Sequence, residues 1–230
     1  MLILFDIDAT LITTQRAGIE ALHGAGQDHF GPGFTTEGVD FAGRLDPLIL
    51  ADLLVRNALE PTPANRGVLR DGYRRRLASI LAEPGRANAC PGVMDLLAAL
   101  AGRPGVTLGL LTGNFPDTGA LKLRAAGIEP EGFPVRVWGD ESPHDPPARE
   151  HLVPVGLERY ATLAGSPADP ARVTVIGDTP HDVACARAHG CRSLAVATGM
   201  YSRLDLERAG ATAAVENLSS TGEVLGWLLD

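Results

Sequence analysis

Short apolar runs alternate with helical patterns along most of this 230-residue chain. The strands that they predict lie at residues 2–6, 106–111, 134–138, 172–176 and 192–197, with a last short apolar run at 213–215. Continuous apolar runs of this length are typical of strands that are buried on both faces. From residue 92 onward, helical patterns occupy residues 92–102, 116–127, 147–164, 180–189, 202–209 and 219–228. Strands that alternate with helices predict an α/β protein, a parallel sheet with helices on both faces.

The part of the chain that follows the first strand has a different pattern. Helical patterns at 17–28, 46–58 and 64–82 are interrupted by an irregular, glycine-rich stretch at 29–44. We expect no strand between residues 14 and 90. The sequence therefore predicts a helical domain, residues 15–89, inserted into a core domain made of residues 1–14 and 90–230.

Composition narrows the class of protein. With 45% hydrophobic residues the chain can bury a sizeable core, and its net charge of −8 disfavours nucleic acid or anionic membranes as partners. The three cysteines, Cys90, Cys185 and Cys191, lack metal-site spacing and cannot all pair, which indicates reduced thiols in the cytoplasm. No apolar run approaches the length of a membrane span, and the first run lacks the basic leader of a signal peptide. The sequence leaves the oligomeric state open.

Two aspartates follow the first apolar run. While the chain stays extended, period-two alternation sends Asp6 and Asp8 to the same side. Close carboxylates raise each other's pKa unless a cation lies between them, and Mg²⁺ prefers oxygen ligands. The alternative is a strand end with two solvated acids.

Polar groups also follow two later runs, and in open α/β sheets ligands bind at the carboxyl ends of the strands. Thr112, Gly113 and Asn114 precede a helix, where a hydroxyl and backbone N–H groups suit a phosphate. Asp178 and Asp182 lie four residues apart across a strand end and a helix start, so both can approach one cation. Helix capping is the simpler explanation for each group.

The order Asp-x-Asp-x-Thr-Leu, Thr-Gly-Asn, Gly-Asp-x-x-x-Asp resembles that of haloacid dehalogenase (HAD) superfamily hydrolases, of the phosphoglycolate phosphatase-like branch. The resemblance implies a HAD-like, doubly wound (Rossmann-like) parallel sheet with a helical cap domain inserted after the first strand. It also implies a Mg²⁺-dependent phosphatase that hydrolyses a small phosphate monoester, phosphoglycolate-like or a sugar phosphate, through an aspartyl-phosphate. An aspartate at position 8 separates the phosphatases and phosphomutases of the superfamily from its dehalogenases.

The resemblance assigns a role to each of these groups. Asp6 is the expected nucleophile, because a carboxylate can attack phosphorus, and Asp8 is the expected general acid and base. Thr112, Gly113 and Asn114 are the expected phosphate ligands. The metal ligands are expected to be Asp6, Asp178, the backbone carbonyl of Asp8, and Asp182 through water or as a supporting group.

The chain departs from the family pattern in two places. Ala9 replaces the usual glycine, so a methyl group restricts the backbone there. The usual lysine of a Lys-Pro-x-Pro loop is missing from residues 142–149. We assign its role, neutralising the nucleophile and the phosphate, to Lys122, the only lysine of the chain, with Arg149 as the alternative. An ordinary surface cation is the simpler explanation of either residue.

Residues 41–46, Phe-Ala-Gly-Arg-Leu-Asp, resemble the substrate-contacting loop of helical caps. Arg44 is therefore expected to bind a substrate carboxylate or phosphate, or else to pair with Asp46 at the surface. Two other functions stay open. A sugar phosphate phosphomutase would use the same residues, and a non-catalytic phosphate-binding protein could keep the same fold.

Overall fold

A computed structural model describes all residues, 1–230, and contains one six-stranded parallel sheet. The strand order is β5-β4-β1-β6-β7-β8, so the first strand lies in the middle of the sheet. This arrangement confirms the predicted α/β fold. The strands are β1 (Leu2–Phe5), β4 (Thr107–Leu111), β5 (Val135–Val137), β6 (Val173–Gly177), β7 (Arg192–Val196) and β8 (Ala213–Val215).

Helices cover both faces of the sheet because the side chains of β1 alternate between two cores. Ile3 and Phe5 pack into one apolar cluster, whereas Leu2 and Leu4 pack into another on the opposite face. The first cluster involves α4 (Val93–Leu100), α5 (Pro116–Ala125) and α9 (Thr221–Leu229). The second face is covered by α6 (Leu152–Ala164), α7 (Pro180–Ala188) and α8 (Arg203–Arg208). Short 3₁₀ turns lie at Pro130–Gly132, Arg149–His151 and Pro170–Arg172.

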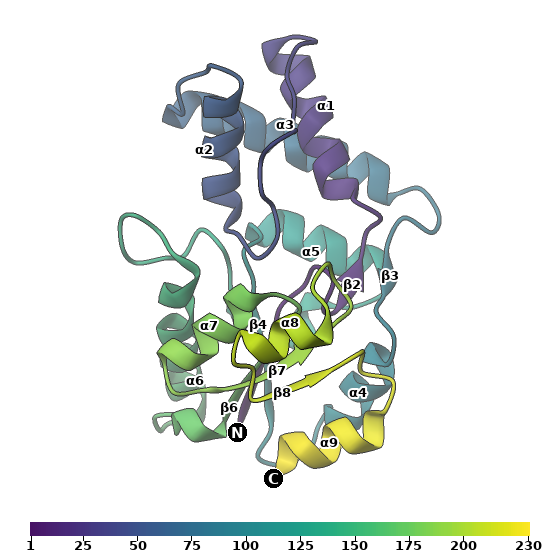
Figure 1. The fold of residues 1–230 in the computed structure, drawn as a ribbon, viewed down its shortest axis with the longest axis vertical. Coiled ribbons are helices and arrows are strands. Elements are labelled where there is room, and N and C mark those ends of the chain that lie inside the picture. Colours follow the sequence, from purple (N-terminus) through teal and green to yellow (C-terminus); the bar gives the residue numbers. More distant parts are fainter.

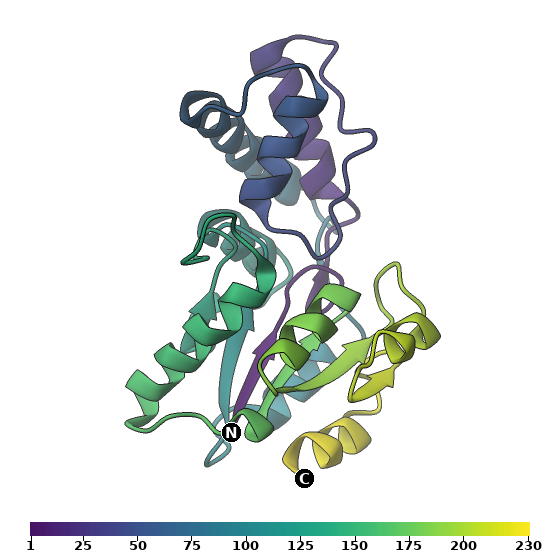
Figure 2. The ribbon, with the colours of Figure 1, turned by 60° about the vertical axis from the view of Figure 1, so that its left-hand side comes forward.

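The helical insertion forms a separate layer over the carboxyl-terminal edge of the sheet (Figures 1 and 2). It consists of α1 (Ala17–Phe30), α2 (Asp46–Arg56) and α3 (Pro63–Leu81). These helices bury an apolar cluster of their own, with Leu53, Leu69 and Leu77 among its fully buried members. One residue of the core domain, Phe115, is also part of that cluster.

The structure corrects two expectations. A strand does occur between residues 14 and 90, since β3 (Asn88–Ala89) pairs antiparallel with β2 (Ile12–Thr13) at the base of the insertion. Two-residue strands are too short to leave a periodic pattern. The helix expected from residue 147 begins only at Leu152, because Ala148 is extended and residues 149–151 form the 3₁₀ turn instead. No helix combines the length and hydrophobicity that crossing a bilayer requires.

Candidate active site

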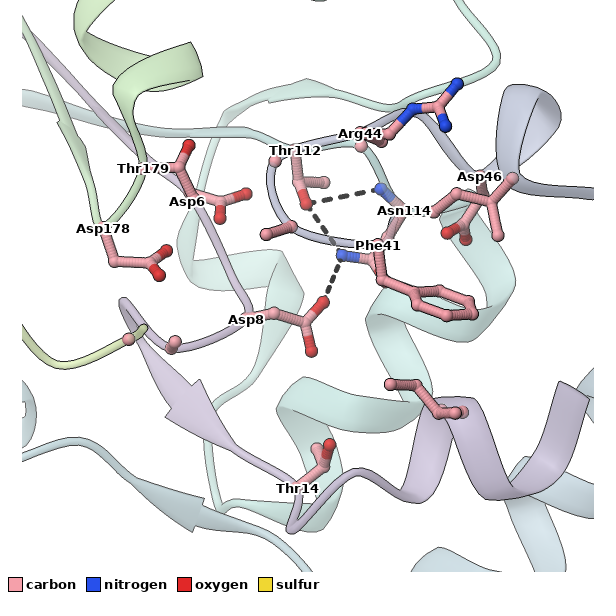
Figure 3. A pocket seen from close by; sticks show the side chains of 18 of the residues that line it. Asp6, Asp8, Thr14, Phe41, Arg44, Asp46, Thr112, Asn114, Asp178 and Thr179 are labelled. Carbon is pink, nitrogen blue, oxygen red and sulfur yellow. Dashed lines mark hydrogen bonds between the residues drawn. The ribbon is translucent and has the colours of Figure 1, made fainter. Parts of the chain in front are cut away.

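Three neighbouring strands end in polar side chains at one edge of the sheet. Asp6 follows β1, Thr112 follows β4 and Asp178 follows β6, and β4 and β6 are the two strands that flank β1. All three side chains are buried, with at most 5% of each residue exposed. Figure 3 shows them gathered on one side of the cavity beneath the insertion. The sheet topology therefore brings together the groups that the sequence places far apart.

Asp6, Asp178 and Asp182 form a carboxylate cluster whose ligand oxygens lie within 4.8 Å of one another. Asp182 occupies the first turn of α7 and also caps that helix. Its Oδ2 accepts hydrogen bonds from the backbone N–H of Thr179 at 3.1 Å and from the Thr179 hydroxyl at 2.6 Å. The capping that the sequence offered as an alternative is thus present, and Asp182 still turns Oδ1 toward the cluster.

The guanidinium of Arg149 is the cation within this cluster. Its Nη2 lies 2.9 Å from Oδ1 of Asp6 and 2.6 Å from Oδ1 of Asp182. Burial raises the pKa of Asp6 to about 6, although Arg149 opposes the shift. Burial, with the nearby charges of Asp182 and Asp6, raises the pKa of Asp178 to about 8. When its three carboxylates are ionised, the cluster carries two more negative charges than Arg149 balances.

A divalent cation fits this imbalance. Arg149 and Thr179 already bind both oxygens of Asp182, whereas the Asp178 carboxylate receives a single long hydrogen bond, 3.3 Å, from the Thr10 hydroxyl. Asp6 and Asp178 are therefore the carboxylates with oxygens left for a metal, and Asp182 is suited to a supporting position. Gly199 helps to shape the site, because a Cβ atom there would lie 1.8 Å from Oδ2 of Asp178.

The Asp8 carboxylate is not part of that cluster, contrary to the expected alternation with Asp6. The strand ends at Phe5, and the chain turns after Asp8. Lys122 donates to both carboxylate oxygens of Asp8, at 3.0 and 2.7 Å, and to Oδ1 of Asn114 at 2.7 Å. Asn114 in turn donates to Asp8 at 2.8 Å. Only the backbone carbonyl of Asp8 is left as a candidate metal ligand.

The expected pairing of Lys122 with Asp6 is wrong. Lys122 lies on α5, which covers one face of the sheet, whereas Arg149 precedes α6 on the opposite face. Asp6 therefore pairs with Arg149, the alternative considered above, and Lys122 pairs with Asp8. Both cations are buried rather than ordinary surface charges.

The loop 112–114 presents the groups expected of a phosphate site. The Thr112 hydroxyl accepts a hydrogen bond from the Asn114 side chain at 2.8 Å (Figure 3). The backbone N–H of Gly113 is buried and donates to no other group of the chain. Because buried N–H groups are normally paired, this donor is available to an anion.

Ala9 adopts the backbone conformation that glycine would adopt most easily. Its φ angle is 55°, in the left-handed region. The carbonyl of Ala9 accepts a hydrogen bond from the Thr198 hydroxyl. The turn after Asp8 therefore forms with alanine, at a conformational cost of about 1 kcal/mol.

Arg44 does not pair with Asp46. Its Nη1 lies 2.5 Å from Oδ2 of Asp52 on the same helix as Asp46, and in Figure 3 its guanidinium points away from Asp6. Asp46 instead faces the core domain. Sequence reasoning missed this position because an acidic residue at the start of a helix is already accounted for by the helix dipole.

Insertion and core enclose a cavity of about 640 Å³ above the carboxylates. Most of its lining from the insertion is apolar, including Ile19, Leu22, Val39, Phe41 and Ile49.

Comparison with known proteins agrees with this geometry. Residues 152–221 match a family model described as HAD-hydrolase-like. A phosphoglycolate phosphatase of Rhodospirillum rubrum is 28% identical over 98% of this chain and 90% of its own. By these matches the chain is similar to HAD-like hydrolases.

One more sequence relative and a solved structure also match most of the chain. The pyrophosphatase PpaX of Bacillus pumilus is 27% identical over 85% of this chain and 82% of its own. CbbY from Rhodobacter sphaeroides, solved in complex with phosphate, superposes with a TM-score of 0.78 at 23% identity and 96% coverage of each chain. The fold is therefore shared with CbbY over nearly the whole length of the chain.

Proposed function

We propose that this protein is a HAD-type, Mg²⁺-dependent phosphatase that hydrolyses a small phosphate monoester through an aspartyl-phosphate on Asp6. The observation that carries the proposal is the position of Asp6. It is buried at the floor of the cavity, paired with Arg149 and clustered with Asp178. The name of the phosphoglycolate phosphatase that matches nearly the whole chain supports the same reaction, and the name of the pyrophosphatase supports phosphoryl hydrolysis in general.

In the proposed first step, a carboxylate oxygen of Asp6 attacks the phosphorus and the bond to the leaving oxygen breaks. Asp6 must be ionised to act, although its burial raises its pKa to about 6 even with Arg149 beside it. Arg149 favours the ionised form and would also stabilise negative charge on the phosphoryl oxygens. Asp6, Asp178 and the carbonyl of Asp8 would hold Mg²⁺, which would supply further positive charge for the phosphoryl group.

The 112–114 loop would hold the phosphoryl group during transfer. The buried N–H of Gly113 and the hydroxyl of Thr112 point to a site for its oxygens at the end of β4. Donors fixed in advance in a buried site stabilise developing charge without reorganising.

Asp8 would donate a proton to the leaving oxygen and later take one from the attacking water. Its carboxylate is 44% exposed and is held by Lys122 and Asn114. These two contacts fix its direction, so Lys122 acts on the acid rather than on the nucleophile.

The cap domain, residues 15–89, would close over the substrate and exclude bulk water. Its apolar lining suits the carbon skeleton of a small alcohol. Arg44 could bind a second anionic group, such as the carboxylate of phosphoglycolate, after leaving Asp52. Phosphoglycolate is a candidate substrate because a relative bears that name.

A panel of phosphate monoesters, with release of inorganic phosphate as readout, tests the proposal. It should include 2-phosphoglycolate, hexose phosphates and p-nitrophenyl phosphate, each with Mg²⁺ and with EDTA. We expect turnover of at least one ester that EDTA abolishes. Isomerised sugar phosphate without free phosphate would indicate a phosphomutase, and no turnover of any ester would indicate a binding protein.

A further inference from the structure

Asp46 connects the insertion to both sides of the 112–114 loop. It is the first residue of α2, and only 9% of it is exposed. Its backbone N–H donates to the carbonyl of Gly113 at 2.7 Å. Its Oδ2 accepts a hydrogen bond from the backbone N–H of Phe115 at 2.9 Å and lies 3.5 Å from the hydroxyl of Thr118. One residue of the insertion thus binds the chain before and after Asn114.

Helix α5 lacks a cap from its own sequence. Phe115 stands at its N-cap position and has no side-chain acceptor, whereas serine, threonine or aspartate usually fills that position. The carboxylate of Asp46 supplies an acceptor from the other domain, and its negative charge is favourable at a helix N-terminus. If Asp46 only stabilised the N-terminus of α2, its carboxylate would not need to be buried against α5.

Two other contacts fasten the start of α5 to the insertion. The ring of Phe115 packs within the apolar cluster of the insertion. The guanidinium of Arg70, on α3, lies 3.8 Å from the centre of that ring. These contacts join the insertion to the core domain. If the insertion moved away from the core, the contacts of Phe115 and the hydrogen bonds of Asp46 would break together.

Helix α5 connects the contacts of Phe115 and Asp46 to the groups proposed to act in catalysis. Lys122 lies two turns after Phe115 and donates to Asp8 at 2.7 Å and to Asn114 at 2.7 Å. A shift of the start of α5 would therefore move the 112–114 loop and the Lys122–Asp8 pair together.

We propose that Asp46 is a positioning residue through which closure of the insertion fixes the phosphate loop and the general acid. The inference rests on the proposed phosphatase function and adds to it. In this role Asp46 acts through its bonds to Gly113 and Phe115 and not by binding the phosphate or the metal itself. Catalysis then depends on the closed arrangement, in which Asp46 holds the chain on both sides of Asn114.

The test compares Asp46→Ala and Asp46→Asn with Asp71→Asn, a control at an exposed carboxylate of α3. We expect Asp46→Ala to lower kcat for 2-phosphoglycolate or p-nitrophenyl phosphate about 10- to 100-fold, since small misplacements of catalytic groups cost about this much. KM should change only a few-fold. The near-isosteric Asp46→Asn should fold, with a kcat between those of wild type and Asp46→Ala. The kcat of the control should match that of wild type.

A double-mutant cycle with Lys122→Met separates positioning from a purely structural role. If Asp46 acts through Lys122, the losses in kcat of Asp46→Ala and Lys122→Met will be less than additive. Additive losses, or normal kcat in Asp46→Ala and Asp46→Asn, would overturn the inference while leaving the phosphatase proposal standing. An inactive wild type would overturn both.

Discussion

The guanidinium of Arg149 lies 2.9 Å from the carboxylate of Asp6, in a loop where the related hydrolases are expected to carry lysine. The same Nη2 atom donates to Asp182 at 2.6 Å, so one side chain joins the proposed nucleophile to the capping residue of α7. Guanidinium stays charged and can bind two acceptors in fixed geometry, which makes it a workable substitute for lysine.

Arg149→Lys keeps the positive charge and is expected to retain part of kcat. Arg149→Met should lower kcat at least about 100-fold, because charge stabilisation in a closed site is a large catalytic contribution. Removing a buried charge from its partners also destabilises a protein by about 3–5 kcal/mol. Steady-state rates must therefore be normalised to the folded fraction, measured by circular dichroism. Normal kcat in folded Arg149→Met would exclude Arg149 as the partner of Asp6.

Lys122→Met should affect protonation of the leaving oxygen and not the stabilisation of charge on the phosphoryl group. Lys122 contacts Asp8, so its loss should matter most where the leaving oxygen needs a proton. We expect a large fall in kcat for an alkyl phosphate and a much smaller one for p-nitrophenyl phosphate, whose leaving group needs little protonation. Arg149→Met provides the comparison, since it should slow both substrates alike. Equal losses for both substrates in Lys122→Met would contradict a role through Asp8.

Without metal, Asp178 should make the stability of the protein fall as pH rises. Burial and the neighbouring carboxylates raise its pKa to about 8 in the folded state, against about 3.9 for an unperturbed aspartate. Between these two values the folded state binds a proton that the unfolded state has lost, so this contribution to stability declines from about pH 4 to pH 8.

Thermal melts of wild type and Asp178→Asn in EDTA at pH 5 and pH 8 measure that effect. The melting temperature of wild type relative to the variant should decrease at the higher pH. Saturating Mg²⁺ should raise the melting temperature of wild type at pH 8 and that of the variant much less, because ligand binding stabilises the native state. A pH-independent difference and no response to Mg²⁺ would speak against a metal site.

Ala9→Gly should change the free energy of unfolding by less than about 1 kcal/mol. Relief of the left-handed conformation, φ 55°, is nearly offset by the greater freedom of glycine in the unfolded chain. Ala9→Val should lose more than about 1 kcal/mol, because a β-branched residue tolerates this conformation poorly. Urea titrations of the two variants compare them directly, and equal stability of both would show that the turn carries no strain.

Asp52→Asn should release Arg44 for substrate binding. The Arg44–Asp52 pair, 2.5 Å, would otherwise compete with a substrate carboxylate. We expect Asp52→Asn to lower KM for 2-phosphoglycolate and Arg44→Ala to raise it, each by a few-fold, with ethyl phosphate unaffected. Equal effects on both substrates would place Arg44 outside carboxylate recognition.

The sequence predicted those parts of the site that depend on strand ends. Asp6, Thr112 and Asp178 could be located because apolar runs mark buried strands, and parallel strands end at the same edge of a sheet. The partners of Lys122 and Arg149 could not be predicted, since they depend on which face of the sheet α5 and the loop of Arg149 cover. Asp46 escaped notice for a similar reason, because its partner, the N–H of Phe115, belongs to another domain and has no side-chain signature.

Turnover of Asp6→Asn tests the central claim most directly. The variant keeps the shape of the side chain but cannot act as an anionic nucleophile, and Asp71→Asn serves as a control for an exposed aspartate. Phosphate release should be followed at saturating Mg²⁺, with circular dichroism to verify the fold. We predict that folded Asp6→Asn loses at least about 1,000-fold in kcat, which corresponds to roughly 4 kcal/mol of transition-state stabilisation. Turnover within a few-fold of wild type would contradict the assignment of Asp6 as the nucleophile.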